Sequence, residues 1–177
     1  MRAMTQIVFA LLACLGLAAP ALAQIRVGQT AGFSGPVAGS VKEASDGAHL
    51  YFNAVNSRGG INGQKIELVS MDDKFEVALA LSNAQALIGQ GVIALFLTRG
   101  TPHNQALMPL LTEARIPLVG PSTGAMVLHE PVHPWLFNVR ATYQREAERA
   151  IHHLLQRASP APRCWSRACA VPARPRT

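Results

Sequence analysis

Cysteine is absent from the whole stretch between Gln24 and Gln156, and the three cysteines of the chain, Cys14, Cys164 and Cys169, lie outside it. This stretch, the body of the chain, therefore has no disulfide framework and offers no thiol nucleophile. A bridge between Cys164 and Cys169, if it formed in an oxidising compartment, would close only a very short loop.

The body also lacks an excess of charge of either sign. The whole chain has a formal net charge of +6, yet ten Lys/Arg and ten Asp/Glu balance between Gln24 and Gln156. The excess consists of Arg2 and five arginines from Arg157 onward. A basic protein would suggest a nucleic-acid partner, but this neutral body argues for none.

No apolar run is long enough to span a membrane. The main run, Ile7 to Ala19, is shorter than the roughly 20 residues that a spanning helix needs. Arg2 precedes it and Ala21-Leu22-Ala23 follows, which is typical of a signal peptide over residues 1–23 that is cleaved before Gln24. Cys14 lies inside the run, so a lipid anchor is not expected. We predict a soluble, exported chain, long enough for one domain.

Apolar periodicity predicts that strands and helices alternate along the body. Helical spacing changes to short apolar runs and back, with Gly59-Gly60 as a helix stop, Asn62-Gly63 as a turn and Thr142 as a helix N-cap. The expected strands are 25–31, 65–71, 92–97, 116–119 and 135–139, and the expected helices are 41–57, 77–88, about 106–114 and 143–155. This order specifies an α/β fold with a mostly parallel sheet and helices on both faces.

Hydroxyl-bearing residues gather after the predicted strands. Loops 98–104 and 120–124 both follow strands of one βαβ unit, so they should emerge at the same carboxyl edge of the sheet, where ligands bind in such folds. Hydroxyls and free amides there suit a carboxylate, and backbone carbonyls suit an ammonium group. We call this predicted set the polar edge: Ser34, Ser40, Thr101, His103, Ser122, Thr123 and Gly124. It predicts small-molecule recognition, with no cofactor or metal.

An alternative interpretation makes the chain a small secreted serine hydrolase. Gly120-x-Ser122-x-Gly124 matches the nucleophile elbow and follows a strand. A histidine and an acid would have to activate Ser122, and the candidates are Glu130 with His133, or Glu146 with His152 or His153. The well-patterned sequence after Ser122 is too short for the strands that normally separate those partners, so binding is preferred.

Two further patterns suggest metal sites. His129-Glu130-Pro131-Val132-His133 matches H-E-x-x-H, but Pro131 and Pro134 disfavour the helix on which that zinc motif depends. Asp72-Asp73 could hold a cation, although an acidic pair at the end of a strand more often caps the next helix.

The composition changes abruptly at Arg157. Residues 157–177 contain four prolines and no acidic residue, and they have no apolar periodicity. We expect a disordered, basic, Pro/Arg/Ala-rich tail. It would either bind something anionic or be an unrelated, out-of-frame end, and the second interpretation is preferred. The expected organisation is a signal peptide (1–23), a ligand-binding lobe (24–156) and this tail.

With these residues in view, the chain resembles the periplasmic substrate-binding proteins of branched-chain amino acid ABC transporters, which include leucine-binding proteins. The resemblance runs in order from about Ile25 to Leu154. It consists of Gly32-Phe33-Ser34-Gly35-Pro36, Asn56-Ser57-Arg58-Gly59-Gly60-Ile61-Asn62-Gly63, Asp72-Asp73, Gly100-Thr101-Pro102 and Ile116-Pro117-Leu118-Val119-Gly120-Pro121-Ser122-Thr123-Gly124.

The resemblance implies the N-terminal lobe of a type I periplasmic binding fold. It implies a periplasmic location, an amino acid or related carboxylate as ligand, and an ABC permease in the membrane as partner of the complete protein. Ser40, Thr101, His103, Ser122, Thr123 and Gly124 are the implied ligand contacts. The family's second lobe has no counterpart in this sequence, so we expect a truncated lobe that binds weakly. A ligand-sensing lobe is the other interpretation within this resemblance.

Overall fold

The computed structural model describes residues 24–158, so the predicted signal peptide and the predicted tail beyond residue 158 lie outside the described residues. The strands are β1 (Ile25–Ala31), β2 (Ile66–Asp72), β3 (Ala94–Phe96), β4 (Leu118–Val119) and β5 (Leu136–Phe137). The helices are α2 (Ala38–Ser57), α3 (Val77–Gly89), α4 (Thr101–Ala114) and α5 (Tyr143–Ala158), with a 3₁₀ turn, η1 (Met126–Leu128), before β5.

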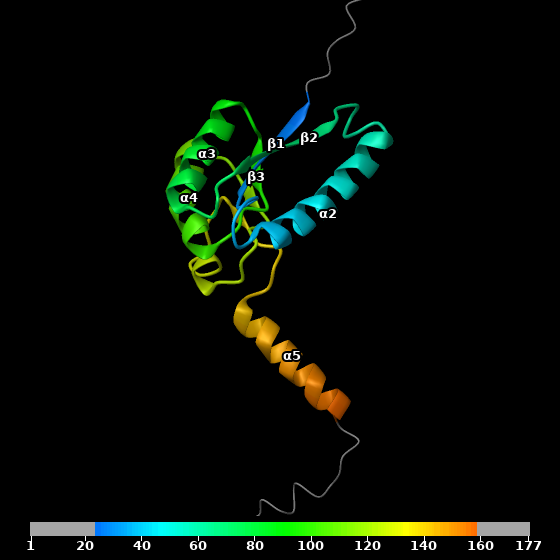
Figure 1. Ribbon diagram of the computed structural model, residues 1–177, viewed down its shortest axis with the longest axis vertical. Helices are drawn as coiled ribbons and strands as arrows, with labels where there is room; N and C mark the ends of the chain where they lie inside the picture. Colours follow the sequence, from blue (N-terminus) through cyan, green and yellow to red (C-terminus); the bar gives the residue numbers. More distant parts are fainter. Residues whose placement is uncertain (1–23, 159–177) are drawn as a thin grey trace, which may run out of the picture.

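The five strands form one sheet in the order β2-β1-β3-β4-β5 (Figure 1). Each neighbouring pair in this sheet is parallel. Parallel neighbours require a crossover between consecutive strands, and α2, α3 and α4 supply the first three. The predicted α/β class with a mostly parallel sheet is confirmed.

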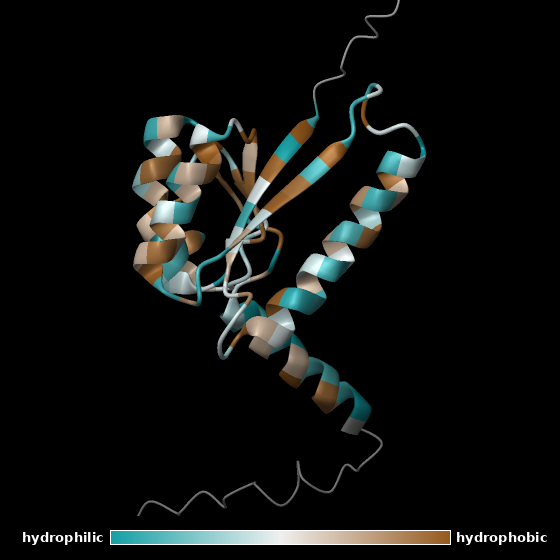
Figure 2. Cartoon of the chain, turned by 45° about the horizontal axis from the view of Figure 1, so that its top comes forward, coloured by the Kyte–Doolittle hydropathy of each residue, from teal (hydrophilic) through white to brown (hydrophobic). Residues whose placement is uncertain are grey.

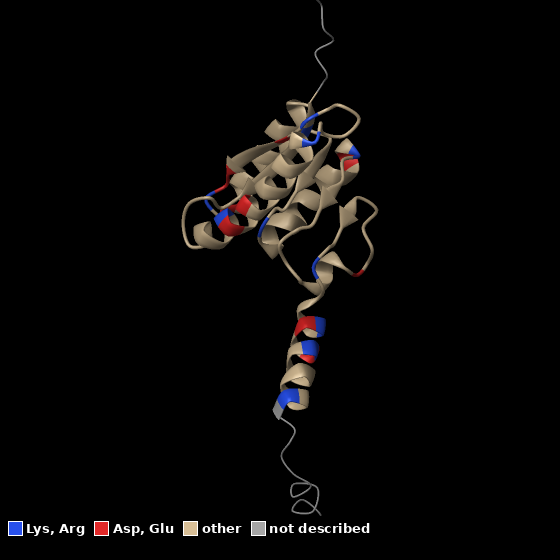
Figure 3. Ribbon diagram, turned by 90° about the vertical axis from the view of Figure 1, so that its right-hand side faces the viewer, with Lys and Arg blue, Asp and Glu red and all other residues tan. Residues whose placement is uncertain are grey.

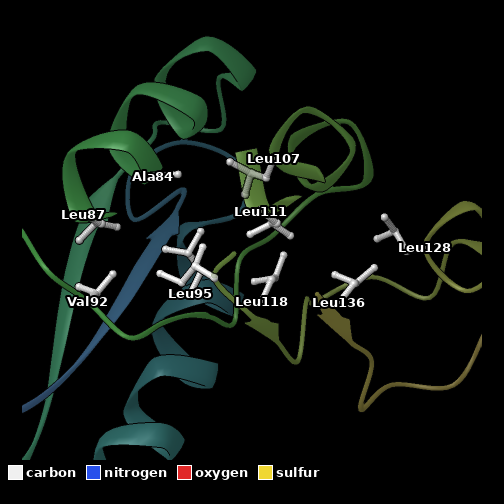
Figure 4. Packing of buried hydrophobic residues seen from close by; sticks show 10 residues of the cluster. Ala84, Leu87, Val92, Leu95, Leu107, Leu111, Leu118, Leu128 and Leu136 are labelled. Carbon is white, nitrogen blue, oxygen red and sulfur yellow. The ribbon is translucent and has the colours of Figure 1, made fainter. Parts of the chain in front are cut away.

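The main core lies between the sheet and the helices α3 and α4 (Figure 4). Leu87 of α3, Leu107 and Leu111 of α4, Leu95 of β3 and Leu118 of β4 are all fully buried there. The apolar residues of α3 and α4 recur at helical spacing because each helix packs one side against the sheet.

Helix α2 covers the opposite face, over β1 and β2 (Figure 1). Its buried residues are Val41 and Ser45. Ser45 lies against Gln29 of β1, whose amide nitrogen donates to the Ser45 hydroxyl at 3.0 Å. Helices on both faces of the sheet are therefore confirmed, and the layer under α2 contains polar as well as apolar contacts.

One predicted boundary matters for the functional site and was wrong. Helix α4 begins at Thr101, so Thr101 and His103 belong to its first turn and not to a loop reaching Asn104. Pro102 in the first turn is the signal that this prediction missed, because proline fits the start of a helix, where its absent N–H is not needed. Helix α2 likewise starts at Ala38, three residues before the predicted start, and β3 to β5 are shorter than expected.

The predicted turn between α2 and β2 is present. Asn62 and Gly63 both have positive φ, 50° and 82°, and Ile61 and Gln64 exchange two backbone hydrogen bonds across them. Gly60 follows the helix with φ of 74°. A Cβ there would lie 2.0 Å from the Gln64 carbonyl oxygen, so only glycine fits.

Helix α5 projects away from the sheet and its covering helices (Figures 1 and 2). The Thr142 hydroxyl accepts from the Arg145 amide at 3.3 Å, as an N-cap should. Ile151, Leu154 and Leu155 are exposed on this helix, which also carries charges of both signs (Figure 3). Arg157 and Ala158, the first two residues of the predicted tail, are helical. Between residues 24 and 158, no helix combines the length and the apolarity that crossing a bilayer requires.

Candidate functional site

The loops after β3 and β4 lie side by side at the carboxyl edge of the sheet. Arg99 and Ser122 form an isolated parallel bridge, and the Ser122 amide donates to the Thr98 carbonyl at 2.7 Å. The two loops thus extend the β3–β4 pairing beyond the strands. The prediction that both loops share one edge is confirmed.

A chain of hydroxyl groups joins the two loops to the start of α5. The Thr101 and Thr123 hydroxyls are 2.8 Å apart, and the Thr123 hydroxyl is 3.1 Å from that of Tyr143. The Tyr143 amide also donates to the Gly124 carbonyl at 2.8 Å. The hydrogen bond with Thr123 is the main reason why the pKa of Tyr143 is lowered. These contacts hold the loop after β4 against the first turns of α4 and α5.

An open recess lies between the first turns of α2 and the two loops. Its lining combines polar and apolar side chains, none of them acidic: Gln29, Ser40, Val41, Ala44, Leu97, Arg99 and Ser122. Gln29 is fully buried and forms the floor. Its amide is held by Ser45 and by Ser70, whose hydroxyl donates to the Gln29 carbonyl oxygen at 3.0 Å. A small ligand there would meet hydroxyls, a guanidinium and aliphatic carbons.

Two of the six predicted contact residues, Ser40 and Ser122, line this recess. Ser40 lies in the first turn of α2, where its hydroxyl donates to the Val37 carbonyl at 2.9 Å and keeps its lone pairs free. Thr101 and Thr123 are joined to each other. Gly124 is buried, and a Cβ on it would lie 2.6 Å from the Ala141 carbonyl oxygen.

His103 does not line the recess. It is buried, stacks on Phe75 with 4.6 Å between ring centroids, and neither ring nitrogen has a hydrogen-bond partner within residues 24–158. Gly100 packs so closely that a Cβ there would lie 2.5 Å from His103 Nδ1. Ligand contact by His103 stays a prediction, and in this structure the residue packs the start of α4 against Phe75.

The pair Asp72-Asp73 organises the loop after β1 and does not cap the next helix. Asp72 accepts from the Ser34 amide and hydroxyl, at 3.2 and 2.6 Å, and the hydroxyl bond is the main cause of its lowered pKa. Asp73 is buried and accepts from the Thr30 hydroxyl and the Phe75 amide. Burial raises the pKa of Asp73. Helix α3 starts without a side-chain cap, so the capping interpretation was wrong.

Ser122 lacks the surroundings of a catalytic serine. Among the residues that the structure describes, no hydrogen bond joins its hydroxyl to a histidine or a carboxylate. Glu146 pairs with Arg140, and His152 and His153 are exposed on α5. The geometry therefore gives the hydrolase interpretation no support.

The H-E-x-x-H pattern is not helical. Only Met126 to Leu128 form a 3₁₀ turn before it, and His133 instead contacts the Thr112 hydroxyl at 3.1 Å. Across residues 24–158 no group of three or more His, Cys, Asp or Glu side chains gathers as metal ligands would. Within these residues, neither the zinc motif nor Asp72-Asp73 therefore belongs to a set of metal ligands.

Comparison with known proteins identifies the family. The sequence profile of the family described as periplasmic binding protein matches residues 24–161. The chain belongs to the periplasmic binding protein family. This family consists of solute-binding proteins.

Three relatives show how far the similarity extends. A Leu/Ile/Val-binding protein homolog from Brucella melitensis is 33% identical over 92 residues, which are 52% of this chain and 24% of that protein. A substrate-binding periplasmic protein from Ralstonia solanacearum is 37% identical with a TM-score of 0.69, over 75% of this chain and 38% of that one. A branched-chain amino acid transporter substrate binding protein from Streptococcus pneumoniae, in complex with isoleucine, is 30% identical with a TM-score of 0.58, over 68% of this chain and 34% of that one.

This periplasmic binding lobe thus corresponds to a minor part of its relatives. The matched stretch spans about a quarter of the curated protein from Brucella and just over a third of the two structures. The resemblance to branched-chain amino acid binding proteins is confirmed.

Sequence reasoning missed three features of this lobe's recess. Gln29 lies inside the predicted strand 25–31 and is fully buried, and the mixed sequence of that strand does not single it out. Arg99 was treated as part of a polar loop. The aliphatic side chains of the recess, Val41, Ala44 and Leu97, were also not predicted. Apolar spacing shows which residues are buried, but it does not show which of them line a cavity.

Proposed function

We propose that this chain binds an amino acid of the branched-chain type as the ligand-binding component of an ABC transport system. The observation that supports this most is the recess at the carboxyl edge, where Ser40 of α2 and Ser122 after β4 come to the same small space. The names of the relatives point to the same ligand class.

The roles of the polar edge follow from its contacts. The Ser122 hydroxyl can donate to a ligand carboxylate, and the Ser40 hydroxyl does so by turning away from the Val37 carbonyl. The first turns of α2 and α4 add backbone N–H groups with the positive end of the helix dipole. Thr101, Thr123 and Gly124 hold the loop after β4 against the first turns of α4 and α5. Val41, Ala44 and Leu97 receive its aliphatic side chain.

The proposal includes a periplasmic location and a partner. The signal peptide predicted over residues 1–23 would direct export, and a membrane permease would receive the ligand. N-terminal sequencing of the chain from a periplasmic fraction tests the first part: the expected start is Gln24, and a retained Met1 would contradict it.

A single lobe covers its ligand from one side. Much of the ligand's apolar surface stays in water, so little burial is available to offset the loss of its translational freedom. We expect leucine to bind this chain with a dissociation constant no tighter than about 0.1 mM. Calorimetry that gave micromolar binding would show that this lobe alone forms the complete site.

Nuclear magnetic resonance titration with leucine tests the site. The expected result is a progressive shift of the backbone amides of Ser40, Arg99 and Ser122. Ser40→Ala and Ser122→Ala should each weaken binding by about tenfold, since each removes one hydrogen bond to a charged group. Ser82→Ala, on the exposed side of α3, is the matched control.

Two outcomes would contradict the proposal. Leucine, isoleucine and valine could all leave the three amides unmoved at saturating concentration, in which case the recess is not an amino-acid site. Alternatively, a serine-reactive phosphonate could label Ser122 covalently, which would favour the hydrolase interpretation.

A further inference from the structure

The recess contains one charged side chain, that of Arg99, and lacks an opposite charge to match it. Its other polar residues are Gln29, Ser40 and Ser122. The ion pairs found within residues 24–158 use Arg26, Lys42 and Arg140, and Arg99 takes part in none of them. A partly buried guanidinium without a carboxylate partner is costly, because burial removes water that it cannot replace.

The backbone on both sides fixes Arg99 at this place. Leu97 has φ of 53° and Gly100 has φ of 97°, so the chain turns sharply before and after the residue. The bridge to Ser122 holds the main chain of Arg99 against the neighbouring loop. Arg99 is therefore presented to the recess by a defined turn.

Two helix N-termini add positive potential near the recess. Helix α2 starts beside Ser40 and helix α4 starts directly after Gly100, and neither has an acidic residue in its first turn or a side-chain cap. Unsatisfied N–H groups at such ends favour anions. The Arg99 guanidinium, the Ser122 hydroxyl and the helix ends thus all favour negative charge in the recess, and no lining side chain is acidic.

We propose that Arg99 binds the carboxylate of the ligand through a bidentate ion pair and thereby sets the ligand class of this lobe. The ligand is a small carboxylate with an aliphatic body that packs on Val41, Ala44 and Leu97. Its α-amino group contributes little here, because no lining side chain is acidic. This inference rests on the proposed function and specifies which group of the ligand is recognised. The lobe recognises the carboxylate and tolerates the loss of the amino group.

Three compounds of the same shape separate the contributions. Leucine, 4-methylpentanoate (leucine without its amino group) and 3-methylbutylamine (leucine without its carboxylate) are each titrated into the isotope-labelled chain. We expect leucine and 4-methylpentanoate to bind within about threefold of each other, and the amine to produce no shift at the Arg99 and Ser122 amides.

Substitutions at position 99 then test the residue itself. Arg99→Gln should weaken the binding of both carboxylates by about tenfold or more, and Arg99→Lys should weaken it less, because it keeps the charge but loses the bidentate geometry. Arg58→Gln, at the exposed far end of α2, is the matched control and should change nothing. Circular dichroism spectra establish that each variant is folded.

The outcomes distinguish this inference from the proposed function. Leucine binding that is unchanged in folded Arg99→Gln, or binding of leucine without binding of 4-methylpentanoate, would overturn the role of Arg99 and leave the amino-acid site intact. If none of the three compounds shifts the loop amides of the unaltered chain, the proposed function fails, and the inference fails with it.

Discussion

The Thr101 and Thr123 hydroxyls, 22 residues apart in the chain, lie 2.8 Å from each other and tie the loop after β4 to the first turn of α4. Thr123 also contacts the Tyr143 hydroxyl at 3.1 Å, so one buried oxygen joins three segments. Strands β3 and β4 both end at this edge of the sheet. The Thr101–Thr123 hydrogen bond therefore fixes the relative position of the segments that follow them.

Replacing Thr123 with valine keeps the shape of the side chain and removes this oxygen. Thr123 is 1% exposed, so the Thr101 hydroxyl would lose a buried partner, whereas Tyr143 is 46% exposed and its hydroxyl can turn to water. We expect the free energy of unfolding, measured by urea denaturation, to fall by about 1–3 kcal/mol. Ser82→Ala on the exposed side of α3 should cost less than about 0.5 kcal/mol. Equal effects of the two substitutions would show that the Thr123 hydroxyl contributes no more to the free energy of unfolding than an exposed hydroxyl.

The buried carboxyl of Asp73 should make stability depend on pH. Burial raises its folded-state pKa, whereas its unfolded pKa is ordinary, about 3.9. The folded state therefore holds the proton more tightly, and the stability from this group is present below the unfolded pKa and lost as pH rises to the folded pKa.

Urea denaturation of Asp73→Asn at several pH values checks this sign. Asparagine cannot ionise, so the variant should gain stability relative to the unaltered chain as pH rises from about 3.9 through the folded pKa. Glu43→Gln, exposed on α2, is the control and should show no such trend. A difference between Asp73→Asn and the unaltered chain that is constant with pH would contradict the prediction.

Two glycine-to-alanine substitutions should have opposite effects. Gly100 has φ of 97°, and a Cβ there would lie 2.5 Å from His103 Nδ1 and 3.1 Å from the Phe75 ring. Gly100→Ala should lower the free energy of unfolding by about 1–3 kcal/mol. Gly47 lies inside α2, and a Cβ there would meet nothing within 4 Å, so Gly47→Ala should stabilise by about 0.5–1 kcal/mol. Thermal denaturation measures both, and a stabilising Gly100→Ala would refute the close packing.

A buried and an exposed leucine should differ widely in their contribution to the free energy of unfolding. Leu118 of β4 is fully buried in the core, whereas Leu154 of α5 is 64% exposed. Leu118→Ala should cost about 2–5 kcal/mol, because it leaves a cavity. Leu154→Ala should change the free energy of unfolding by less than about 0.5 kcal/mol. A large loss for Leu154→Ala would mean that α5 packs on the lobe in solution.

Much of this fold was predictable from local patterns. The strand β1, the stop of α2 at the glycines, the Asn62-Gly63 turn and the Thr142 cap are each set by residues within a few positions, and each is present. The start of α4 was missed because the polar residues Thr101 and His103 were read as loop, although Pro102 already favours a helix start.

By itself, the sequence determined the α/β class, the mostly parallel sheet and the edge at which the two hydroxyl-bearing loops meet, because periodicity and crossover rules depend only on spacing along the chain. Only the tertiary structure decided which side chains face the recess. It placed Arg99 and Gln29 there and turned His103 onto Phe75. The direction of a loop side chain depends on the backbone turns and on contacts with segments distant in the sequence. The local sequence pattern predicts neither.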